Sequence, residues 1–433
     1  MPSSQQTEEL YAHYATRPVV TTDSRNIPAG AIFFALRGPS FNGNAFAADA
    51  LRRGASLAVV DDPTVLPADA GEARAQGYFM VDDVLATLQA LAARHRMQLG
   101  IPILAITGTN GKTTTKELTH VVLSQRYRTY ATRGNLNNHI GVPLTLLSMT
   151  PDTELGIVEM GASAPGEIAA LCLIARPDYG LITNIGKAHL EGFGGEEGVK
   201  AAKGELYDWL AANGGYAFVR RDDATLTALA AQRPALKRID YDASAAEGVQ
   251  SRLTGDYNRF NIAAAATIGR RFGVAEEAIR RAVAEYTPTI NRSQTIRTER
   301  NLVVADCYNA NPSSMRAALE WFAHTAPHDL DEEVAGKAVI LGDMLELGGW
   351  SAAEHRAVLD MLPGMGLDLA ILIGPEFCAA ADALPGGTGS PATFPDTETA
   401  LRELHDRFAS LTRMAVLLKG SRGMALERII PSL

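Results

Sequence analysis

The sequence predicts an α/β protein of three consecutive domains, and three observations support this fold class. The length of 433 residues is enough for about three domains of ordinary size. Short apolar runs rich in β-formers alternate with stretches of helical spacing, which is typical of parallel sheets covered by helices. A Gly-Ile-Pro break at 100–102 separates the first unit from the second. We therefore expect domains over 1–97, 98–294 and 295–433.

The first unit is expected to be a small mixed α/β domain. Apolar runs at 31–36 and 56–60 predict two strands, and the helical spacing of 46–53 predicts a helix between them. An apolar stripe that begins at Val84 and repeats at i, i+3 and i+4 predicts a helix that closes the unit.

The second and third units are each expected to contain a mainly parallel sheet, because strand and helix signals alternate along both. One helix of the second unit is expected to have Pro165 near its first turn and to run toward Ala175. The segment at 351–354 predicts a capping box at the start of a helix in the third unit. The predicted strands of the second unit are 103–106, 156–159, 179–183 and 216–219. Those of the third unit, which we expect to be Rossmann-like, are 302–305, 338–341, 369–373 and 414–418.

Charge and hydropathy argue against two classes of partner. The chain has 40 Lys and Arg against 49 Asp and Glu, a net charge of −9, so we expect no nucleic acid partner, which usually requires a basic face. The longest apolar run, 168–175, is far shorter than the roughly 20 residues of a membrane span, so we expect no membrane partner. A local basic pocket for a phosphorylated small molecule is compatible with this balance.

Cysteine use and the N-terminus indicate a cytoplasmic protein. Cys172, Cys307 and Cys378 are widely spaced, which predicts neither a disulfide framework nor a metal-binding pair. Glu8 and Glu9 lie where a signal peptide would have a basic start and then an apolar stretch. We expect a reduced protein that acts as a monomer.

The strongest chemical signal is the segment Thr-Gly-Thr-Asn-Gly-Lys-Thr-Thr at 107–114, which follows a predicted strand and precedes a helical stretch. Glycine-rich loops of this kind bind phosphate through backbone amides and a helix N-terminus. Lys112 would neutralise the β- and γ-phosphates, and the Thr113 hydroxyl would bind Mg²⁺. Ile106 stands where the usual pattern has its first glycine, so the loop is a shortened variant. The alternative, an ordinary glycine-rich turn, is disfavoured by a lysine followed by three threonines.

Two further residues could complete a metal site. Glu159 ends one predicted strand and His189 follows the end of another, and the carboxyl ends of parallel strands gather ligands at one edge of a sheet. Carboxylate oxygens suit Mg²⁺. Taken alone, Glu159 is more often a solvated carboxylate at a strand end and His189 more often an ordinary loop histidine, and their joint placement makes the metal site about as frequent an outcome as these alternatives.

Several segments resemble the Mur ligase family. The phosphate loop is similar to that of the Mur ligases and of their folylpolyglutamate synthase and cyanophycin synthetase relatives. Within the family, the chain resembles the branch that joins D-alanyl-D-alanine to UDP-N-acetylmuramoyl-tripeptide. The segments that carry this resemblance are 23–25, 134–143, 306–315, 341–348 and 418–423.

The resemblance implies that ATP and two Mg²⁺ ions are the cofactors. It places one Mg²⁺ at Thr113 and Glu159, and the second at Glu159, His189 and a carbamylated lysine. The matching lysine is Lys203 rather than the nearby Lys200, because Gly-Glu-Leu-Tyr follows it. Without the resemblance, Lys203 would be interpreted as a solvated helix lysine.

The resemblance also implies nucleotide contacts on both sides of the phosphate loop. Asn261 is expected to contact adenine, Arg292 to reach an ATP phosphate, and Asp306 to bind the ribose. Tyr257 stands where the family usually has His, and Cys307 where it usually has a small polar residue. The loop residues expected to hold the nucleotide are Gly108, Thr109, Asn110, Gly111, Lys112, Thr113 and Thr114.

Substrate contacts are implied in all three units. Ser24 and Arg25 match the side of the first domain that binds uridine diphosphate, and Asn42 is expected near the sugar nucleotide. The remaining substrate residues implied by the resemblance are Asn135, Asn137, Asn138, Tyr308, Asn309 and Ser421.

The activity implied by the resemblance is that of an ATP-dependent amide ligase of peptidoglycan precursor synthesis. The tripeptide carboxylate would attack the γ-phosphorus of ATP, and the amine of D-alanyl-D-alanine would then displace phosphate from the acyl phosphate. Such chemistry depends on positioning and charge neutralisation, to which Lys112, Arg292, Glu159, His189 and Lys203 would contribute. The alternatives are a sibling ligase that adds a single amino acid and a non-catalytic nucleotide-binding scaffold. The sequence lacks the sibling's Asp-Asn-Pro-Arg segment, and a scaffold would need no second metal site.

Overall fold

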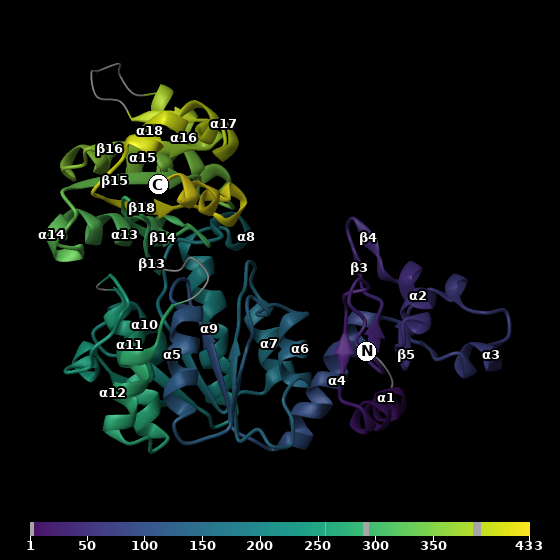
Figure 1. Cartoon of the computed structure of the whole chain (residues 1–433). Helices are drawn as coiled ribbons and strands as arrows, with labels where there is room; N and C mark the ends of the chain where they lie inside the picture. The colour runs from purple at the N-terminus through teal and green to yellow at the C-terminus, as the bar shows by residue number, and fades with distance from the viewer. Residues whose placement is uncertain (1–3, 256, 289–293, 384–390) are drawn as a thin grey trace.

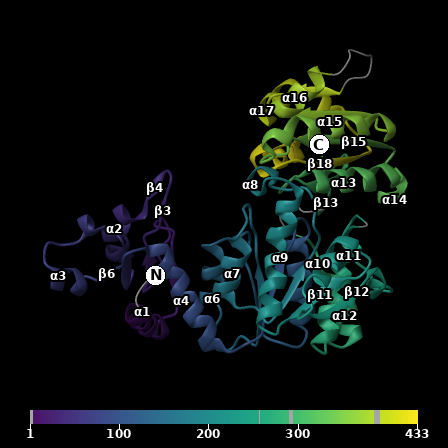
Figure 2. The ribbon, with the colours of Figure 1, turned by 180° about the vertical axis from the view of Figure 1, so that it is seen from behind.

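The computed structural model describes residues 4–255, 257–288, 294–383 and 391–433, which form three lobes in chain order (Figure 1). The N-terminal lobe lies beside the central lobe, and the C-terminal lobe lies at one end of the central lobe, as the two opposite views agree (Figure 2). Each lobe has its own sheet. The predicted α/β class with mostly parallel sheets is confirmed. Among the described residues, no helix combines the length and apolar character that a membrane crossing requires.

The N-terminal lobe contains a four-stranded parallel sheet in the order β1-β2-β5-β6. The predicted helix at 46–53 is present as α2, and the two predicted strands are β2 and β5. The strands are β1 (Val20–Thr21), β2 (Ile32–Phe34), β5 (Leu57–Val60) and β6 (Tyr78–Met80), with β3 (Arg37–Gly38) and β4 (Phe41–Asn42) forming a separate hairpin. The helices are α1 (Ser4–Thr16), α2 (Ala47–Arg52), α3 (Ala70–Ala75) and α4 (Val84–Leu99).

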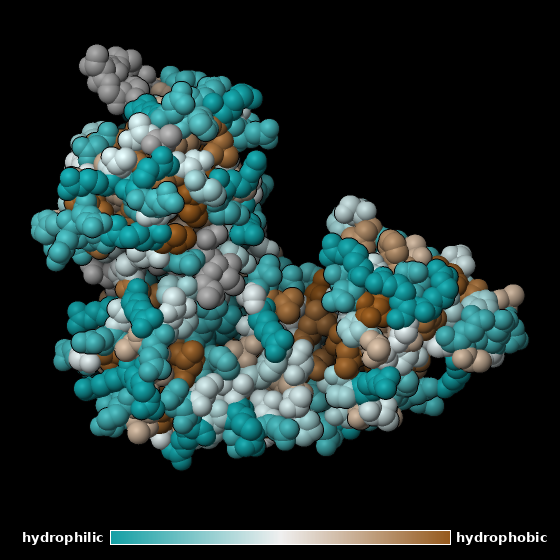
Figure 3. Space-filling model, in the orientation of Figure 1, coloured by the Kyte–Doolittle hydropathy of each residue, from teal (hydrophilic) through white to brown (hydrophobic). Residues whose placement is uncertain are grey.

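Helix α4 packs the N-terminal lobe against the central lobe. Its N-cap, Asp83, accepts a hydrogen bond from the N–H three residues on, and the helix ends at Gly100, whose φ of 61° favours glycine. The core beneath α4 continues from the N-terminal strands into the central sheet. Tyr14 of α1 also donates a hydrogen bond of 2.6 Å to the Leu147 carbonyl. Apolar surface is visible where the two lobes adjoin (Figure 3).

The central lobe contains a six-stranded sheet in the order β12-β11-β10-β7-β9-β8, and every pair is parallel. Alternate residues of β7 face opposite cores: Ile103 and Ala105 belong to one, Leu104 and Ile106 to the other. The strands are β7 (Ile103–Thr107), β8 (Thr129–Ala131), β9 (Leu155–Glu159), β10 (Tyr179–Ile182), β11 (Tyr216–Arg220) and β12 (Lys237–Tyr241). The helices are α5 (Lys112–Leu123), α6 (Gly141–Leu147), α7 (Glu167–Ala175), α8 (Leu190–Phe193), α9 (Glu196–Ala212), α10 (Ala224–Ala231), α11 (Tyr257–Arg271) and α12 (Glu276–Glu285).

Helix α7 begins close to Pro165 and ends at Ala175, as predicted. Gly166 is the N-cap, with a φ of 84°. Glu167 is the first helical residue, and its carboxylate accepts the backbone N–H of Ser163 at 2.7 Å. That bond closes the loop ahead of the helix.

The C-terminal lobe contains a six-stranded sheet in the order β13-β14-β18-β15-β16-β17. Only the edge strand β13 among these six is antiparallel to its neighbour. The strands are β13 (Gln294–Arg297), β14 (Leu302–Asp306), β15 (Gly336–Gly342), β16 (Leu369–Ile373), β17 (Ala392–Phe394) and β18 (Met414–Lys419). The helices are α13 (Pro312–His324), α14 (Pro327–Leu330), α15 (Ser351–Met361), α16 (Pro375–Asp382), α17 (Thr397–Glu403) and α18 (His405–Ser410).

The capping box predicted at 351–354 is wrong. The N-cap of α15 is Trp350, which makes no side-chain cap bond. Glu354, the expected capping partner, instead accepts a hydrogen bond of 2.6 Å from Lys187 Nζ in the central lobe. The charge-assisted hydrogen bond to the central lobe thus takes the place of the expected capping hydrogen bond at the start of α15. A capping box does form at the start of α13, between Asn311 and Ser314.

Candidate active site

The phosphate loop lies between β7 and α5, as predicted, and its two glycines are structurally required. Gly108 has a φ of 137°, and a Cβ there would lie 2.1 Å from Thr183 Oγ1. Gly111 has a φ of 77°, and a Cβ there would lie 2.6 Å from Asn261 Oδ1. Any other residue would clash and would strain the backbone. The loop therefore presents its amides next to the α5 N-terminus, an arrangement that binds anions.

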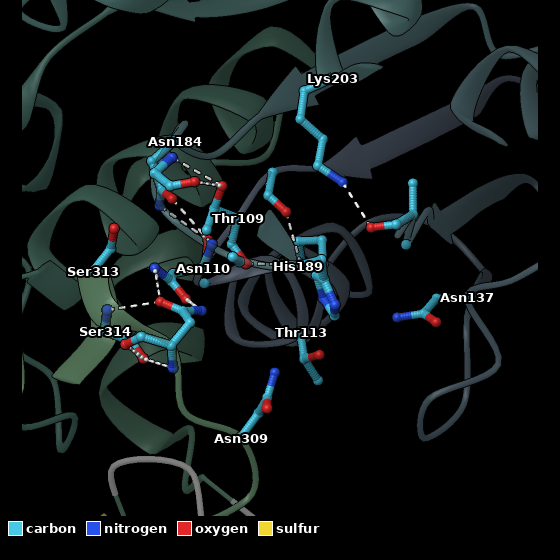
Figure 4. A pocket seen from close by; sticks show the side chains of 18 of the residues that line it. Thr109, Asn110, Thr113, Asn137, Asn184, His189, Lys203, Asn309, Ser313 and Ser314 are labelled. Atoms are coloured by element: carbon cyan, nitrogen blue, oxygen red, sulfur yellow. Dashed lines mark hydrogen bonds between the residues drawn. The ribbon is translucent and has the colours of Figure 1, made fainter. Parts of the chain in front are cut away.

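The end of strand β10 holds this loop in place. Asn184 accepts a hydrogen bond from the Asn110 N–H and donates one to the Asn110 carbonyl, both at 3.0 Å (Figure 4). Thr183 Oγ1 donates to the same carbonyl at 2.6 Å. Asn184 is a loop-positioning residue without a predicted role, although it begins the segment after β10 that contains His189.

Lys112 is folded toward the loop that it follows. Its Nζ donates to the carbonyl of Gly108 at 2.7 Å and to that of Thr109 at 2.9 Å. A positive charge thus lies beside the loop amides, where it can neutralise a bound phosphate.

Glu159 lies at the carboxyl end of β9 and is only 1% exposed. Its Oε1 accepts hydrogen bonds from Thr113 Oγ1 at 3.1 Å and from Asn137 Nδ2 at 2.8 Å. Its Oε2 is buried without a hydrogen-bond partner among the described residues, and the nearest cation is Lys116 Nζ at 3.9 Å. A buried carboxylate oxygen without a partner is costly. It therefore fits a site for a hard cation.

Lys203 enters the same cavity from α9 and is 2% exposed (Figure 4). Its Nζ donates to the Ala162 carbonyl at 3.4 Å and lies 5.2 Å from the centre of the Phe193 ring. Burial, with a further contribution from Lys112, lowers the pKa of Lys203 to about 7. Lys200, the competing lysine, pairs instead with Glu197 at 3.7 Å.

His189 lies in the loop after β10 and precedes α8, with a φ of 50°. Its Nδ1 contacts the carboxylate of Glu346, which comes from the C-terminal lobe. Glu346 is not among the predicted site residues, although it lies in the segment at 341–348 that carries the family resemblance.

Polar residues of the C-terminal lobe close the other side of the cavity. Asp306 at the end of β14 pairs with Lys419 Nζ at 2.6 Å, and Lys419 is 1% exposed. The Arg422 guanidinium lies 5.6 Å from the centre of the Tyr308 ring. Lys419 and Arg422 are not among the predicted site residues, but both lie in the segment at 418–423 that carries the family resemblance.

One cavity of about 850 Å³ between the central and C-terminal lobes collects most of the predicted site residues. Its lining is polar at the phosphate loop and includes residues from both lobes. The predicted residues that line it are Gly108, Thr109, Asn110, Gly111, Lys112, Thr113, Thr114, Asn135, Asn137, Asn138, Glu159, His189, Lys203, Asn261, Asp306, Tyr308 and Asn309.

Other predicted residues lie elsewhere. Ser421 is buried outside the cavity lining, and its Oγ accepts the Leu345 N–H at 3.0 Å. Ser24, Arg25 and Asn42 lie on the N-terminal lobe, which contributes no described residue to the cavity. Arg292 lies outside the described residues.

The N-terminal residues make local contacts. The exposed Arg25 side chain pairs with Asp23 at 2.8 Å, which holds the pKa of the Asp23 carboxyl well below its usual range. Arg53 donates to the carbonyls of Ser24 and Arg25 at 2.5 and 2.7 Å. Asn42 Oδ1 accepts the N–H two residues on at 3.1 Å.

The metal donors available in the cavity are few and are mainly oxygens. Within the described ranges, no group of three or more His, Cys, Asp or Glu side chains could hold a metal ion. The set formed by Glu159, Thr113 and His189 would therefore need oxygens from a nucleotide or water. Mg²⁺ is commonly bound by one or two carboxylates together with substrate phosphates and water, so Glu159 fits such a site.

Family models match the chain in three consecutive segments. Residues 18–96 match a model described as the Mur ligase family, catalytic domain. Residues 106–247 match the Mur ligase middle domain, and residues 291–422 match the Mur ligase, glutamate ligase domain.

Similar proteins cover nearly the whole chain. The UDP-N-acetylmuramoyl-tripeptide–D-alanyl-D-alanine ligase of Bacillus subtilis (strain 168) is 32% identical over 96% of this chain and 92% of the relative. The protein of the same name from Escherichia coli (strain K12) is 32% identical over 98% and 95% of the two chains. A crystal structure of MurF from Acinetobacter baumannii superposes with a TM-score of 0.83 at 29% identity, and covers 100% of this chain and 99% of that one.

Proposed function

Because this chain belongs to the Mur ligase family, we propose that it is the ATP-dependent ligase that joins D-alanyl-D-alanine to UDP-N-acetylmuramoyl-tripeptide in peptidoglycan synthesis. The names of the full-length relatives support this choice of substrates. The observation that carries the proposal is the cavity in which the phosphate loop and Glu159 face polar residues of the C-terminal lobe. The reacting groups of a nucleotide and of two other substrates can meet there.

The reaction proceeds in two steps. The terminal carboxylate of the tripeptide attacks the γ-phosphorus of ATP, which forms an acyl phosphate and releases ADP. The neutral amine of D-alanyl-D-alanine then attacks the acyl carbon, phosphate leaves with the bonding electrons, and the amine loses a proton. Lys112 and the loop amides position and neutralise the phosphates, as phosphoryl transfer requires.

The remaining nucleotide contacts are proposed from the family resemblance. Asn261, which lies beside the phosphate loop at Gly111, is proposed to contact adenine. Asp306, which pairs with Lys419, is proposed to bind the ribose. Arg292 is assigned to an ATP phosphate on the family resemblance alone, because it lies outside the described residues.

Two Mg²⁺ ions would be held by residues that line the cavity. Thr113 and Glu159 are proposed to hold one, and Glu159, His189 and Lys203 the other. When bound, Mg²⁺ would neutralise the negative charge that develops on the phosphate oxygens during transfer. The buried Glu159 Oε2 without a partner supports this donor set.

We further propose that Lys203 works as a carbamate. The neutral amine would attack the carbon of CO₂, form an N–C bond and release one proton to water. The product is an anion with two oxygens, which suits a hard cation better than an ammonium does. Lys203 is buried within the cavity, and its Nζ has one hydrogen-bond acceptor among the described residues, the Ala162 carbonyl at 3.4 Å. This environment supports the modification.

The N-terminal lobe is proposed to bind the uridine diphosphate end of the substrate through Ser24, Arg25 and Asn42. These residues lie outside the nucleotide cavity, as a substrate that spans two lobes would require. Asn135, Asn137, Asn138, Tyr308 and Asn309 line the cavity and are proposed to contact the peptide part. Ser421 would act on substrate only indirectly, through the loop that contains Leu345.

We propose that the protein acts as a monomer in the cytoplasm. Its three cysteines are free, as a reducing compartment would keep them.

A phosphate-release assay tests the proposed function. The protein is supplied with ATP, Mg²⁺ and UDP-N-acetylmuramoyl-tripeptide, and then with D-alanyl-D-alanine, glutamate, lysine or diaminopimelate in turn. We expect release above background only with the dipeptide. Faster release with a single amino acid would assign the chain to a sibling ligase, and no release with any acceptor would favour a binding scaffold.

A further inference from the structure

A carboxylate of the C-terminal lobe reaches the proposed metal ligand of the central lobe. Glu346 lies in the loop between β15 and α15, and its carboxylate contacts Nδ1 of His189. Since a carboxylate has no proton to give when ionised, the imidazole must be the donor. A neutral His189 that carries its proton on Nδ1 has an unprotonated Nε2, which is the form that binds metal.

The loop that carries Glu346 is fixed within its own lobe. The Asp343 carboxylate accepts the N–H groups of Glu376 and Phe377, both at 2.9 Å, at the start of α16. The next two residues donate their backbone N–H groups to buried side chains: Met344 to His355 Nε2 at 3.0 Å, and Leu345 to Ser421 Oγ at 3.0 Å. The position of Glu346 is thus set by the C-terminal lobe before it meets His189.

The segment that carries His189 is fixed against the same loop. Leu190 and Phe193 of α8 share a hydrophobic core with Met344 and Leu347 of the C-terminal lobe. A Cβ at Gly348 would lie 3.1 Å from the Glu191 side chain, so the two segments are in close contact. The His189 and Glu346 side chains are partly exposed, but the backbone segments that carry them are held against each other.

We propose that Glu346 is a positioning residue that holds His189 in its metal-binding tautomer when the C-terminal lobe is docked on the central lobe. The inference rests on the proposed role of His189 in the ligase reaction. It adds a link between lobe docking and the metal site, because the positioning group and the ligand come from different lobes. Carboxylate partners of metal-bound histidines act in this way, and their loss typically weakens metal binding about 10- to 100-fold.

The first test observes the His189 ring without substrate or metal. The full chain is labelled with ¹⁵N-histidine, and the His189 signals are identified by comparison with His189→Gln. We expect the Nδ1-protonated tautomer in the unaltered protein and in Glu346→Gln, whose amide oxygen can still accept. We expect Glu346→Ala to shift the ring toward the Nε2-protonated tautomer. An unchanged tautomer in Glu346→Ala would overturn the inference.

A matched control separates positioning from lobe docking. Glu354→Ala removes the 2.6 Å contact with Lys187, which also joins the two lobes, but leaves the Glu346 contact intact. We expect this variant to retain the wild-type tautomer of His189. The same tautomer shift in Glu354→Ala as in Glu346→Ala would attribute the effect to docking alone and overturn the inference.

The second test measures the affinity for Mn²⁺ alone by the electron paramagnetic resonance signal of the free ion. We expect Glu346→Ala to weaken binding about 10-fold, Glu346→Gln to weaken it less, and Glu346→Ala to have no added effect in the His189→Ala background. Weaker binding in His189→Ala but not in Glu346→Ala would overturn the positioning role alone. No effect of either variant would overturn the metal role of His189 as well. Neither measurement uses the dipeptide. A failed ligase assay would therefore contradict the proposed function without affecting the conclusion about Glu346 and His189.

Discussion

Asn110 of the phosphate loop and Asn311 at the start of α13 exchange side-chain hydrogen bonds across the two lobes. Asn311 Nδ2 donates to Asn110 Oδ1 at 2.8 Å, and Asn110 Nδ2 donates to Asn311 Oδ1 at 3.4 Å. The same Asn311 oxygen accepts the Ser314 N–H at 2.9 Å and so caps α13. The nucleotide loop therefore makes direct contact with the element that begins the C-terminal helical layer.

This contact predicts an effect on nucleotide binding without a loss of stability. Serine and aspartate cap helices about as well as asparagine, so Asn311→Ser and Asn311→Asp should both keep a melting temperature near that of the wild type. Asn311→Ser loses the Asn110 contact, and Asn311→Asp also adds a negative charge near the phosphates. We expect the KM for ATP to rise in Asn311→Ser and to rise further in Asn311→Asp. Wild-type KM values in both variants would show that the contact does not serve nucleotide binding.

Lys112→Ala should lower turnover strongly, because one phosphate charge is left without its partner in the transition state. Removal of one such contact typically costs about 10²–10³ in rate. The measurement is kcat for phosphate release, with Lys200→Ala as the control, since Lys200 pairs with Glu197 outside the cavity. Near-normal turnover of Lys112→Ala would exclude the proposed role of the phosphate loop.

Lys203→Ala should lose most activity if the carbamate is a ligand, and added formate or acetate should restore part of it. Small carboxylates can occupy the space left by the side chain and supply the missing oxygens. A carbamate signal should also appear in the ¹³C spectrum of the unaltered protein in ¹³C-bicarbonate and be absent from the variant. Full activity in CO₂-depleted buffer with no such signal would contradict the proposal.

The stability of the protein should fall in mildly acidic solution because of His95. This side chain of α4 is buried at the contact with the central lobe, where its Nε2 lies 2.9 Å from the Met149 carbonyl. Burial lowers the pKa of His95 below its ordinary value of 6.5, and the Arg94 charge adds to the effect. The unfolded chain therefore binds the proton more readily, so the free energy of unfolding decreases as the pH falls below about 6.5.

His95→Gln tests that prediction, because glutamine can donate to the same carbonyl but does not titrate. We expect its melting temperature to fall less than that of the wild type between pH 7.5 and pH 5. Burial also lowers the pKa values of His13 and His120, so part of the pH dependence should persist. Parallel curves for the two proteins would rule out His95 as a contributor.

The inner strands and the phosphate loop could be predicted from sequence because their determinants are local. Strand β7 is apolar at consecutive positions, as a strand buried on both faces must be. The loop that follows needs glycine at 108 and 111, where φ is positive and neighbouring side chains leave no space for a Cβ. The eight residues at 107–114 are therefore enough to predict the loop.

The capping box at 351–354 was wrongly predicted because a distant residue binds the side chain of Glu354. Glu354 has the spacing of a capping-box partner, but Lys187 of the central lobe binds it at 2.6 Å. The partner that prevails comes from another part of the chain, and no spacing rule includes it.

The sequence by itself determined the α/β class, the phosphate loop and the identity of the charged residues available for catalysis. Only the tertiary structure decided which of those residues meet. His189 and Glu346 are 157 positions apart, Asn110 and Asn311 are 201 apart, and Asp306 and Lys419 are 113 apart. Such contacts form because separate cores place the ends of two sheets against each other, and a side chain's distant partner leaves no periodicity or spacing in its own segment.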